Sequence, residues 1–183
     1  MRTTVLTLVG SAIYATLRYN GFKGVPWEDW PTYTMNKVFA VSAVVLLLVA
    51  ALRRVRGSGS AGPLLGHAAI VTALHVVLSL MLLTPAYFAK YFAAGKLTGT
   101  AGVAMTFGAL ALAWMMRGAL TGRPARGGLA VLAGLTVVHT AVQGFEGWLD
   151  PTTWPGGLPP ITLLSTVLAG AALAIAARGR ARR

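Results

Sequence analysis

The chain has 183 residues, of which 56% are hydrophobic and only 11% are charged. Soluble domains carry about 25% charged residues, so this composition excludes an ordinary soluble protein and indicates a polytopic membrane protein. Cysteine is absent, which excludes disulfides, zinc sites with cysteine ligands and iron–sulfur clusters. The net charge of +12 lies at the ends of apolar runs, so we expect no nucleic-acid partner.

Six apolar runs predict an all-α fold in which a single domain, residues 1–183, forms a bundle of six transmembrane helices. A span needs about 20 apolar residues, with a range of about 17 to 25, so interfacial residues or tilt must complete the first two runs. Only a thin basic region precedes the first run, and the cleavage signal near Ala15 is weak, so we interpret the run as a retained helix and not as a signal peptide. The expected spans are residues 4–17, 37–52, 64–84, 97–116, 128–148 and 160–177.

Basic residues predict the orientation of the bundle, because cytoplasmic loops of membrane proteins are enriched in lysine and arginine. With both termini on one side, that side collects eleven basic residues, and the other side collects five together with every acidic residue. We therefore expect both termini in the cytoplasm and the chain in the inner or plasma membrane, with the lipid bilayer around it. The eleven are Arg2, Arg53, Arg54, Arg56, Arg117, Arg123, Arg126, Arg178, Arg180, Arg182 and Arg183; the five are Arg18, Lys23, Lys37, Lys90 and Lys96.

The two longest exoplasmic loops, residues 19–37 and 146–160, are rich in aromatic side chains. Such side chains among a few charges are typical of a membrane-interface belt and equally of a protein-docking surface. The sequence leaves both interpretations open. The aromatic residues concerned are Trp27, Trp30, Tyr33, Trp148 and Trp154.

Two histidines lie at matching depths in two predicted spans. His75 and His139 each come eleven residues after the start of a run, roughly 16 Å along a helix and near the middle of a ~30 Å hydrocarbon core. An ionisable side chain inside a span is a functional-site hypothesis, and imidazole is the usual protein ligand of haem iron. We predict that His75 and His139 are the axial ligands of one haem b. The alternative is a neutral histidine that donates to a carbonyl of a neighbouring helix.

His67 lies two turns nearer the cytoplasm than His75 and about 80° around the same helix. No histidine of the fifth run shares its depth, so we predict no second haem with two histidine ligands. We assign His67 a secondary role, bonded to a backbone group, a haem propionate, a quinone or a lipid. No Walker loop, dinucleotide fingerprint or Ser-His-Asp arrangement is readable, so another protein must carry any flavin or nicotinamide.

Six spans with histidines in the third and fifth resemble the ferric reductase-like transmembrane domain, which includes the MsrQ/YedZ haem subunits. The stretch LLGHAAIVTALHVVLSL is similar to the third helix of that family, with Gly66 and His75 at the places of its glycine and its ligand histidine. LAVLAGLTVVHTAVQGF resembles the fifth helix, where His139 matches the more exoplasmic histidine. The resemblance covers residues 37–178. It departs at Arg126, where the family often has a second histidine, so it implies one haem at most.

These features predict a haem b electron-transfer subunit that passes single electrons between a quinone or a cytoplasmic reductase and an exoplasmic acceptor. It would be an oxidoreductase subunit and not a complete enzyme. Two alternatives stay open: a haem-free accessory or scaffold subunit of a larger membrane complex, and a subunit that binds a chlorophyll-type tetrapyrrole through one histidine. We expect the last loop, residues 146–160, to lie over the exoplasmic end of the histidine pocket and to help dock a redox partner.

Overall fold

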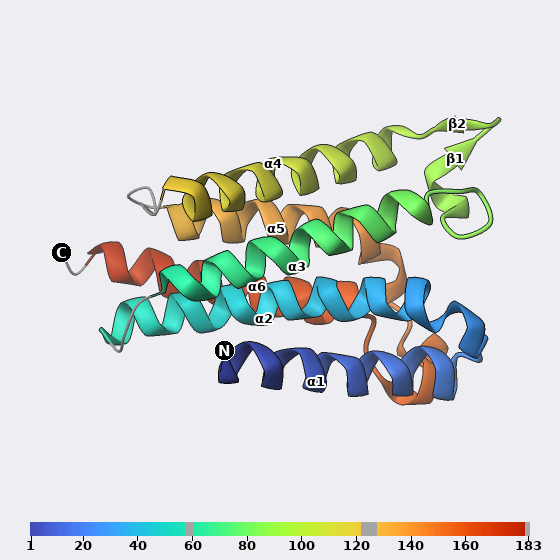
Figure 1. The fold of residues 1–183 in the computed structure, drawn as a ribbon. Helices are drawn as coiled ribbons and strands as arrows, with labels where there is room; N and C mark the ends of the chain where they lie inside the picture. The colour runs from blue at the N-terminus through green and yellow to red at the C-terminus, as the bar shows by residue number, and fades with distance from the viewer. Residues whose placement is uncertain (58–60, 122–127, 182–183) are drawn as a thin grey trace.

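The computed structural model describes residues 1–57, 61–121 and 128–181. Within them, six α-helices run alternately in opposite directions, so α1 begins on the side of the bundle where α6 ends, although α1 starts further from that end than its neighbours (Figure 1). That end carries Arg53, Arg54, Arg56 and Arg117, and we call it the basic end; the opposite end is the loop end. The helices are α1 (Arg2–Thr16), α2 (Met35–Arg56), α3 (Gly62–Met81), α4 (Gly99–Thr121), α5 (Gly128–Gly144) and α6 (Ile161–Ala181).

The sequence predicts that basic residues gather at one end of the bundle, and the described arginines of α2 and α4 do lie at the same end. Arg123, Arg126, Arg182 and Arg183 lie outside the described residues, as does the side chain of Arg180. Arg126, the position at which the ferric reductase-like family often has a second histidine, is therefore not described by the structure.

The loop end is more helical than the sequence predicts. Residues 19–37 are predicted as a loop, but α1 continues into a π-helix, η1 (Leu17–Phe22), and α2 is preceded by η2 (Trp27–Asp29) and by a second π-helix, η3 (Trp30–Thr34). Side-chain hydrogen bonds hold this segment together. Trp30 Nε1–H donates to Thr16 Oγ1 at 2.9 Å, and the buried Thr34 hydroxyl donates to Asn20 Oδ1 at 2.8 Å. Polar residues that are typical of a loop thus satisfy one another inside a helical turn.

Short elements make up the remaining connections at the loop end. Between α3 and α4, η4 (Ala89–Tyr91) leads into an antiparallel hairpin of β1 (Phe92–Ala93) and β2 (Lys96–Leu97). Its turn places Ala94 and Gly95 at positive φ, as two-residue hairpins require. Between α5 and α6 lie η5 (Phe145–Trp148), η6 (Pro151–Thr153) and η7 (Pro155–Gly157).

In the part of the chain that the structure describes, five helical segments are long and apolar enough to cross a membrane: Trp27–Arg56, Gly62–Met81, Gly99–Thr121, Gly128–Trp148 and Pro155–Arg178. They correspond to five of the six predicted spans. The predicted first span, residues 4–17, corresponds to α1, which has only 15 residues and is not among them. The count of six spans is therefore not confirmed.

Five of the helices close into a ring. α2 packs against α3, α3 against α4, α4 against α5, α5 against α6, and α6 returns to α2. α1 lies outside the ring against α2 (Figure 1). α3 and α5 are not neighbours in this ring, so the two helices that carry His75 and His139 lie across it from each other.

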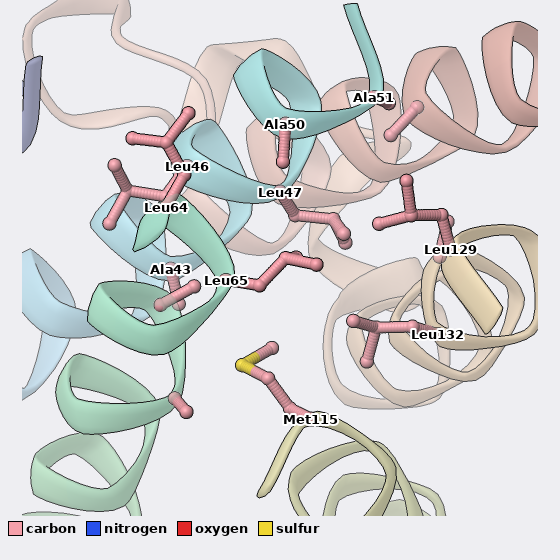
Figure 2. Packing of buried hydrophobic residues seen from close by; sticks show 14 of the residues in the cluster. Ala43, Leu46, Leu47, Ala50, Ala51, Leu64, Leu65, Met115, Leu129 and Leu132 are labelled. Carbon is pink, nitrogen blue, oxygen red and sulfur yellow. The ribbon is translucent and has the colours of Figure 1, made fainter. Parts of the chain in front are cut away.

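An apolar core fills the ring toward the basic end. Figure 2 shows Leu47 of α2, Leu65 of α3 and Met115 of α4 converging there with Leu129 and Leu132 of α5. Small residues let the helix backbones approach closely, which is how helices pack in membranes. In this core they are Ala43, Ala50, Ala51, Ala68, Ala69, Ala111, Ala133 and Ala172.

Candidate functional site

A cavity of about 1040 Å³ lies inside the ring and extends to the loop end. Its wall includes α2 from Asn36 to Leu47 and α4 from Met105 to Met116. Each of these stretches is about 16 Å long at 1.5 Å per residue. The core around Leu47 forms the floor, and most of the wall is apolar. The cavity can therefore take an elongated, largely apolar ligand.

His75 of α3 lies half-buried in the cavity wall. Its Nδ1 is 3.1 Å from the backbone carbonyl oxygen of Asn36, at the start of α2. Because a carbonyl only accepts, Nδ1 carries the proton and Nε2 keeps its lone pair. Among the described residues, Nε2 has no hydrogen-bond partner. It is free to bind a metal ion or to accept a hydrogen bond from a ligand.

Asn36 also holds the backbone of the same histidine. Its side chain is fully buried, and its Nδ2 donates to the carbonyl oxygen of His75 at 3.1 Å and to Ser79 Oγ at 2.7 Å. One residue of α2 thus positions both the imidazole and the helix turn that carries it.

His139 of α5 is held by α4. Its Nδ1 donates to the backbone carbonyl oxygen of Ala104 at 2.7 Å, so its Nε2 also carries the lone pair. That Nε2 lies 3.1 Å from Gln143 Nε2, and the amide must be the donor in this pair. The ring lies directly on Gly108, where a Cβ atom would come within 2.8 Å of Cε1. Only glycine at this position leaves room for the imidazole.

The two histidines share one arrangement on opposite helices. An Nδ1–H bond to a carbonyl is typical of metal-binding histidines, because it orients the ring and leaves Nε2 as the ligand atom. A purely structural histidine makes the same bond, so the state of Nε2 separates the two interpretations. The Nε2 of His75 is open and that of His139 is engaged by Gln143. Both residues line the same cavity.

The two histidines lie at similar distances from the ends of their helices, and their predicted place near the middle of a hydrocarbon core stays a prediction. His75 lies six residues before the end of α3, and His139 lies five before the end of α5, or about 9 and 8 Å from the loop end of each helix. α3 begins at Gly62, two residues earlier than predicted, because Pro63 is well tolerated in a first helical turn. Both histidines are therefore nearer the loop end than the basic end.

His67 lies away from this cavity. Its Nδ1 is 2.8 Å from Thr4 Oγ1, so it links α3 to α1 outside the ring. Its partner here is a hydroxyl group, and it does not line the cavity with His75 and His139.

The last loop covers the loop end of the cavity, as the sequence predicts. Thr153, Trp154 and Pro155 line the cavity there. Gly156 has φ of 60° and lies against the ring of Phe22 in η1, where a Cβ would come within 2.4 Å. Close packing of a left-handed glycine on an aromatic ring gives this loop a fixed place.

Most of the predicted aromatic belt has hydrogen-bond partners inside the protein. Trp148 Nε1–H donates to Thr162 Oγ1 at 3.0 Å, and Trp154 Nε1–H donates to the Gly147 carbonyl oxygen at 3.1 Å. Trp27 differs, since it is 67% exposed. It is the tryptophan of the loop end that best suits an interface with lipid or a partner.

Sequence reasoning missed three residues around the histidines: Asn36, Gly108 and Gln143. Gln143 follows His139 by four residues, on the same helix face, so its spacing could have found it. Asn36 stands out as a polar residue at the head of an apolar run. Gly108 carries no signal in the sequence, because its closeness to His139 depends on how α4 packs against α5.

Comparisons with models of known families, with curated proteins and with solved structures found no match. The resemblance to the ferric reductase-like transmembrane domain therefore rests on the sequence and stays a prediction.

Proposed function

We propose that this chain is an integral membrane subunit that binds one haem b through His75 and His139 and transfers electrons. The observation that carries the proposal is the pair of histidines on facing helices of one ring, each with Nδ1 held by a carbonyl and each lining the same cavity. The cavity volume of about 1040 Å³ is at the upper end of ligand pockets, which hold about 300–1,000 Å³. Its largely apolar wall suits the ring of a haem.

When bound, haem iron would supply one-electron transfer. The chain's own residues orient the ligands and exclude water. The carbonyls of Asn36 and Ala104 select the tautomer in which Nε2 binds, and Gly108 makes space for the ring of His139. The carboxamide of Gln143 has to rotate away from His139 before that nitrogen can bind a metal.

The proposed topology has six spans, with the basic end in the cytoplasm of a cell whose inner or plasma membrane holds the chain. α1 supports a sixth span because it continues to Phe22, and at its other end Thr3 Oγ1 accepts from Arg53 Nη2 at 3.0 Å. α1 thus extends from the loop end to an arginine of the basic end. An exoplasmic redox partner would dock at the loop end, nearer the histidines, while a quinone or a cytoplasmic reductase would act from the other side.

A specific observation favours a second candidate, the haem-free accessory subunit. Both ring nitrogens of His139 are satisfied by protein groups, as in a structural histidine. A chlorophyll-type ligand on one histidine would use the open Nε2 of His75. Both alternatives predict a visible spectrum different from that of a haem with two histidine ligands.

The decisive experiment is a visible spectrum of the purified protein, titrated with haemin in a neutral detergent. We expect a Soret band with split α and β bands, the signature of low-spin haem b. His75→Ala and His139→Ala should abolish it, whereas His67→Ala, outside the cavity, should keep most of it. Retention of the full low-spin spectrum in both cavity variants would show that the axial assignment is wrong. A protein without visible absorption would favour the accessory subunit, and a red pigment band the chlorophyll-type ligand.

A further inference from the structure

Four basic side chains and one acidic side chain line the cavity at the loop end: Arg18, Lys23, Lys37, Lys90 and Glu146. No ion pair neutralises any of the four among the described residues. We call the four basic side chains the cationic mouth. Arg18 is buried and Lys37 is half-buried, whereas Lys23 and Lys90 are exposed. A buried charge without a counter-charge costs free energy, so Arg18 and Lys37 favour an anionic partner at this place.

Arg18 is the strongest member of the cationic mouth. It is only 6% exposed, and its Nη1 donates to the carbonyl oxygen of Leu158. Its buried Nε has no hydrogen-bond partner among the described residues. It lies in the π-helix η1, and Tyr33 of the mouth wall lies in the second π-helix. Such turns often occur at functional sites because they re-aim side chains.

The lysines stand close together on aromatic rings. Lys37 Nζ lies 4.9 Å from the ring centre of Tyr33, and Lys23 Nζ lies 5.5 Å from the same centre. Lys23 and Lys90 are both near enough to Lys37 to repel its charge. Cation–π contacts ease this crowding without neutralising it.

Lys90 completes the cationic mouth from the segment between α3 and α4. Its ammonium group donates to the carbonyl oxygen of Gln143, next to the histidine pocket. Partial burial of that group lowers the pKa of Lys90, and the charge of Glu146 opposes this effect. An anion bound here would accept hydrogen bonds from the basic side chains, and Glu146 is the one acidic side chain of the lining that would compete with it for them.

We propose that the cationic mouth binds an anionic group, a carboxylate or a phosphate, carried by an amphipathic ligand whose apolar body fills the cavity. Guanidinium and ammonium groups bind such oxygens through charge-assisted hydrogen bonds. The inference rests on the cavity and its charges and not on ligation by the histidines. The carboxylates of a haem and the head of a fatty acid or an anionic lipid share this chemistry.

Binding to the haem-free protein in a neutral detergent tests the proposal in two arms. One arm compares hexadecanoate with hexadecanol, and the other compares haemin with its dimethyl ester. Each acid should bind on the order of tenfold more tightly than its neutral analogue in at least one arm. Lys37→Gln and Lys90→Gln should reduce that preference. Lys96→Gln, an exposed lysine at the same end outside the cavity lining, is the matched control.

The outcomes separate this proposal from haem ligation. A preference in the haemin arm alone identifies porphyrin carboxylates, and one in the hexadecanoate arm alone identifies a fatty-acid type of ligand. A low-spin spectrum without any preference for acids would leave the axial ligation standing and overturn the cationic mouth. Equal binding of acids and neutral analogues in both arms, no binding in either, or an equal effect of Lys96→Gln would overturn it as well.

Discussion

At the scale of single residues, one hydrogen bond decides what each imidazole of the site can do. The carbonyls of Asn36 and Ala104 can only accept, so they place the proton on Nδ1 and leave Nε2 as the reactive nitrogen. The two sites then differ in a single group, the carboxamide of Gln143 on His139. That group is a competitor for any metal ligated by His139.

Gln143→Ala tests this competition. Removing the amide should raise the affinity for haemin by about 2- to 10-fold, because a neutral hydrogen bond contributes about 0.5–1.5 kcal/mol. Haemin titration followed by absorbance measures the change. A lower affinity in the variant would mean that Gln143 supports the ligand and does not compete with it.

Gly108→Ala tests the space that the ring of His139 needs. The added methyl group would come within 2.8 Å of Cε1, so either the ring shifts or α4 and α5 separate. We expect a loss of about 1–3 kcal/mol in the free energy of unfolding, together with impaired haemin binding. Gly102→Ala on the same helix is the control, since nothing lies within 4 Å of its Cβ position. Thermal unfolding in detergent compares the two, and equal midpoints would contradict the proposed contact.

At the scale of elements, buried polar side chains join the helices. Asn36 of α2 reaches two groups of α3, and Asn20 of η1 accepts from Thr34 of η3. Each pair satisfies polar groups that would otherwise be costly inside an apolar environment. These hydrogen bonds fix the position of each helix along the axis of its neighbour. Packing of alanine and leucine side chains alone specifies that position less sharply.

Asn36→Leu should therefore destabilise the pairing of α2 with α3. Two acceptors on α3 lose their donor, and the expected cost is about 1–3 kcal/mol in the free energy of unfolding. Ser42→Ala offers a matched control, because Ser42 is equally buried on the same helix and its Oγ has no hydrogen-bond partner within the described parts of the chain. The control should be neutral or slightly stabilising in chemical unfolding. A comparable loss in both variants would argue against a specific role of Asn36.

At the scale of the whole molecule, charge and topology define two different ends. The closed core lies toward the basic end, whereas the open cavity, the histidines and the cationic mouth lie toward the loop end. Of the two ends of the bundle, only the loop end therefore gives a ligand access to the cavity. If the basic end is cytoplasmic, the mouth belongs to the exoplasmic side.

Single cysteines test this orientation cleanly, because the natural chain has none. Trp27→Cys at the loop end should react with a membrane-impermeant maleimide on intact cells. Ala61→Cys at the basic end should react only after the membrane is opened, and Thr3→Cys should behave like it if α1 crosses the membrane. Labelling of Ala61→Cys from outside would reverse the orientation. If Thr3→Cys reacts on intact cells as Trp27→Cys does, α1 does not cross the membrane and the proposed sixth span is wrong.

The sequence by itself determined the features that depend on local composition. Apolar runs gave the helical segments, arginines marked one end, and His75 and His139 stood out because a polar group inside a span is costly. The tertiary structure decided everything that depends on which helices become neighbours. It set α3 opposite α5, left a cavity between them, brought Gly108 under His139 and gathered the cationic mouth from three separate segments. Hydropathy and charge act along the chain, whereas cavities and close contacts arise from packing between residues distant in sequence.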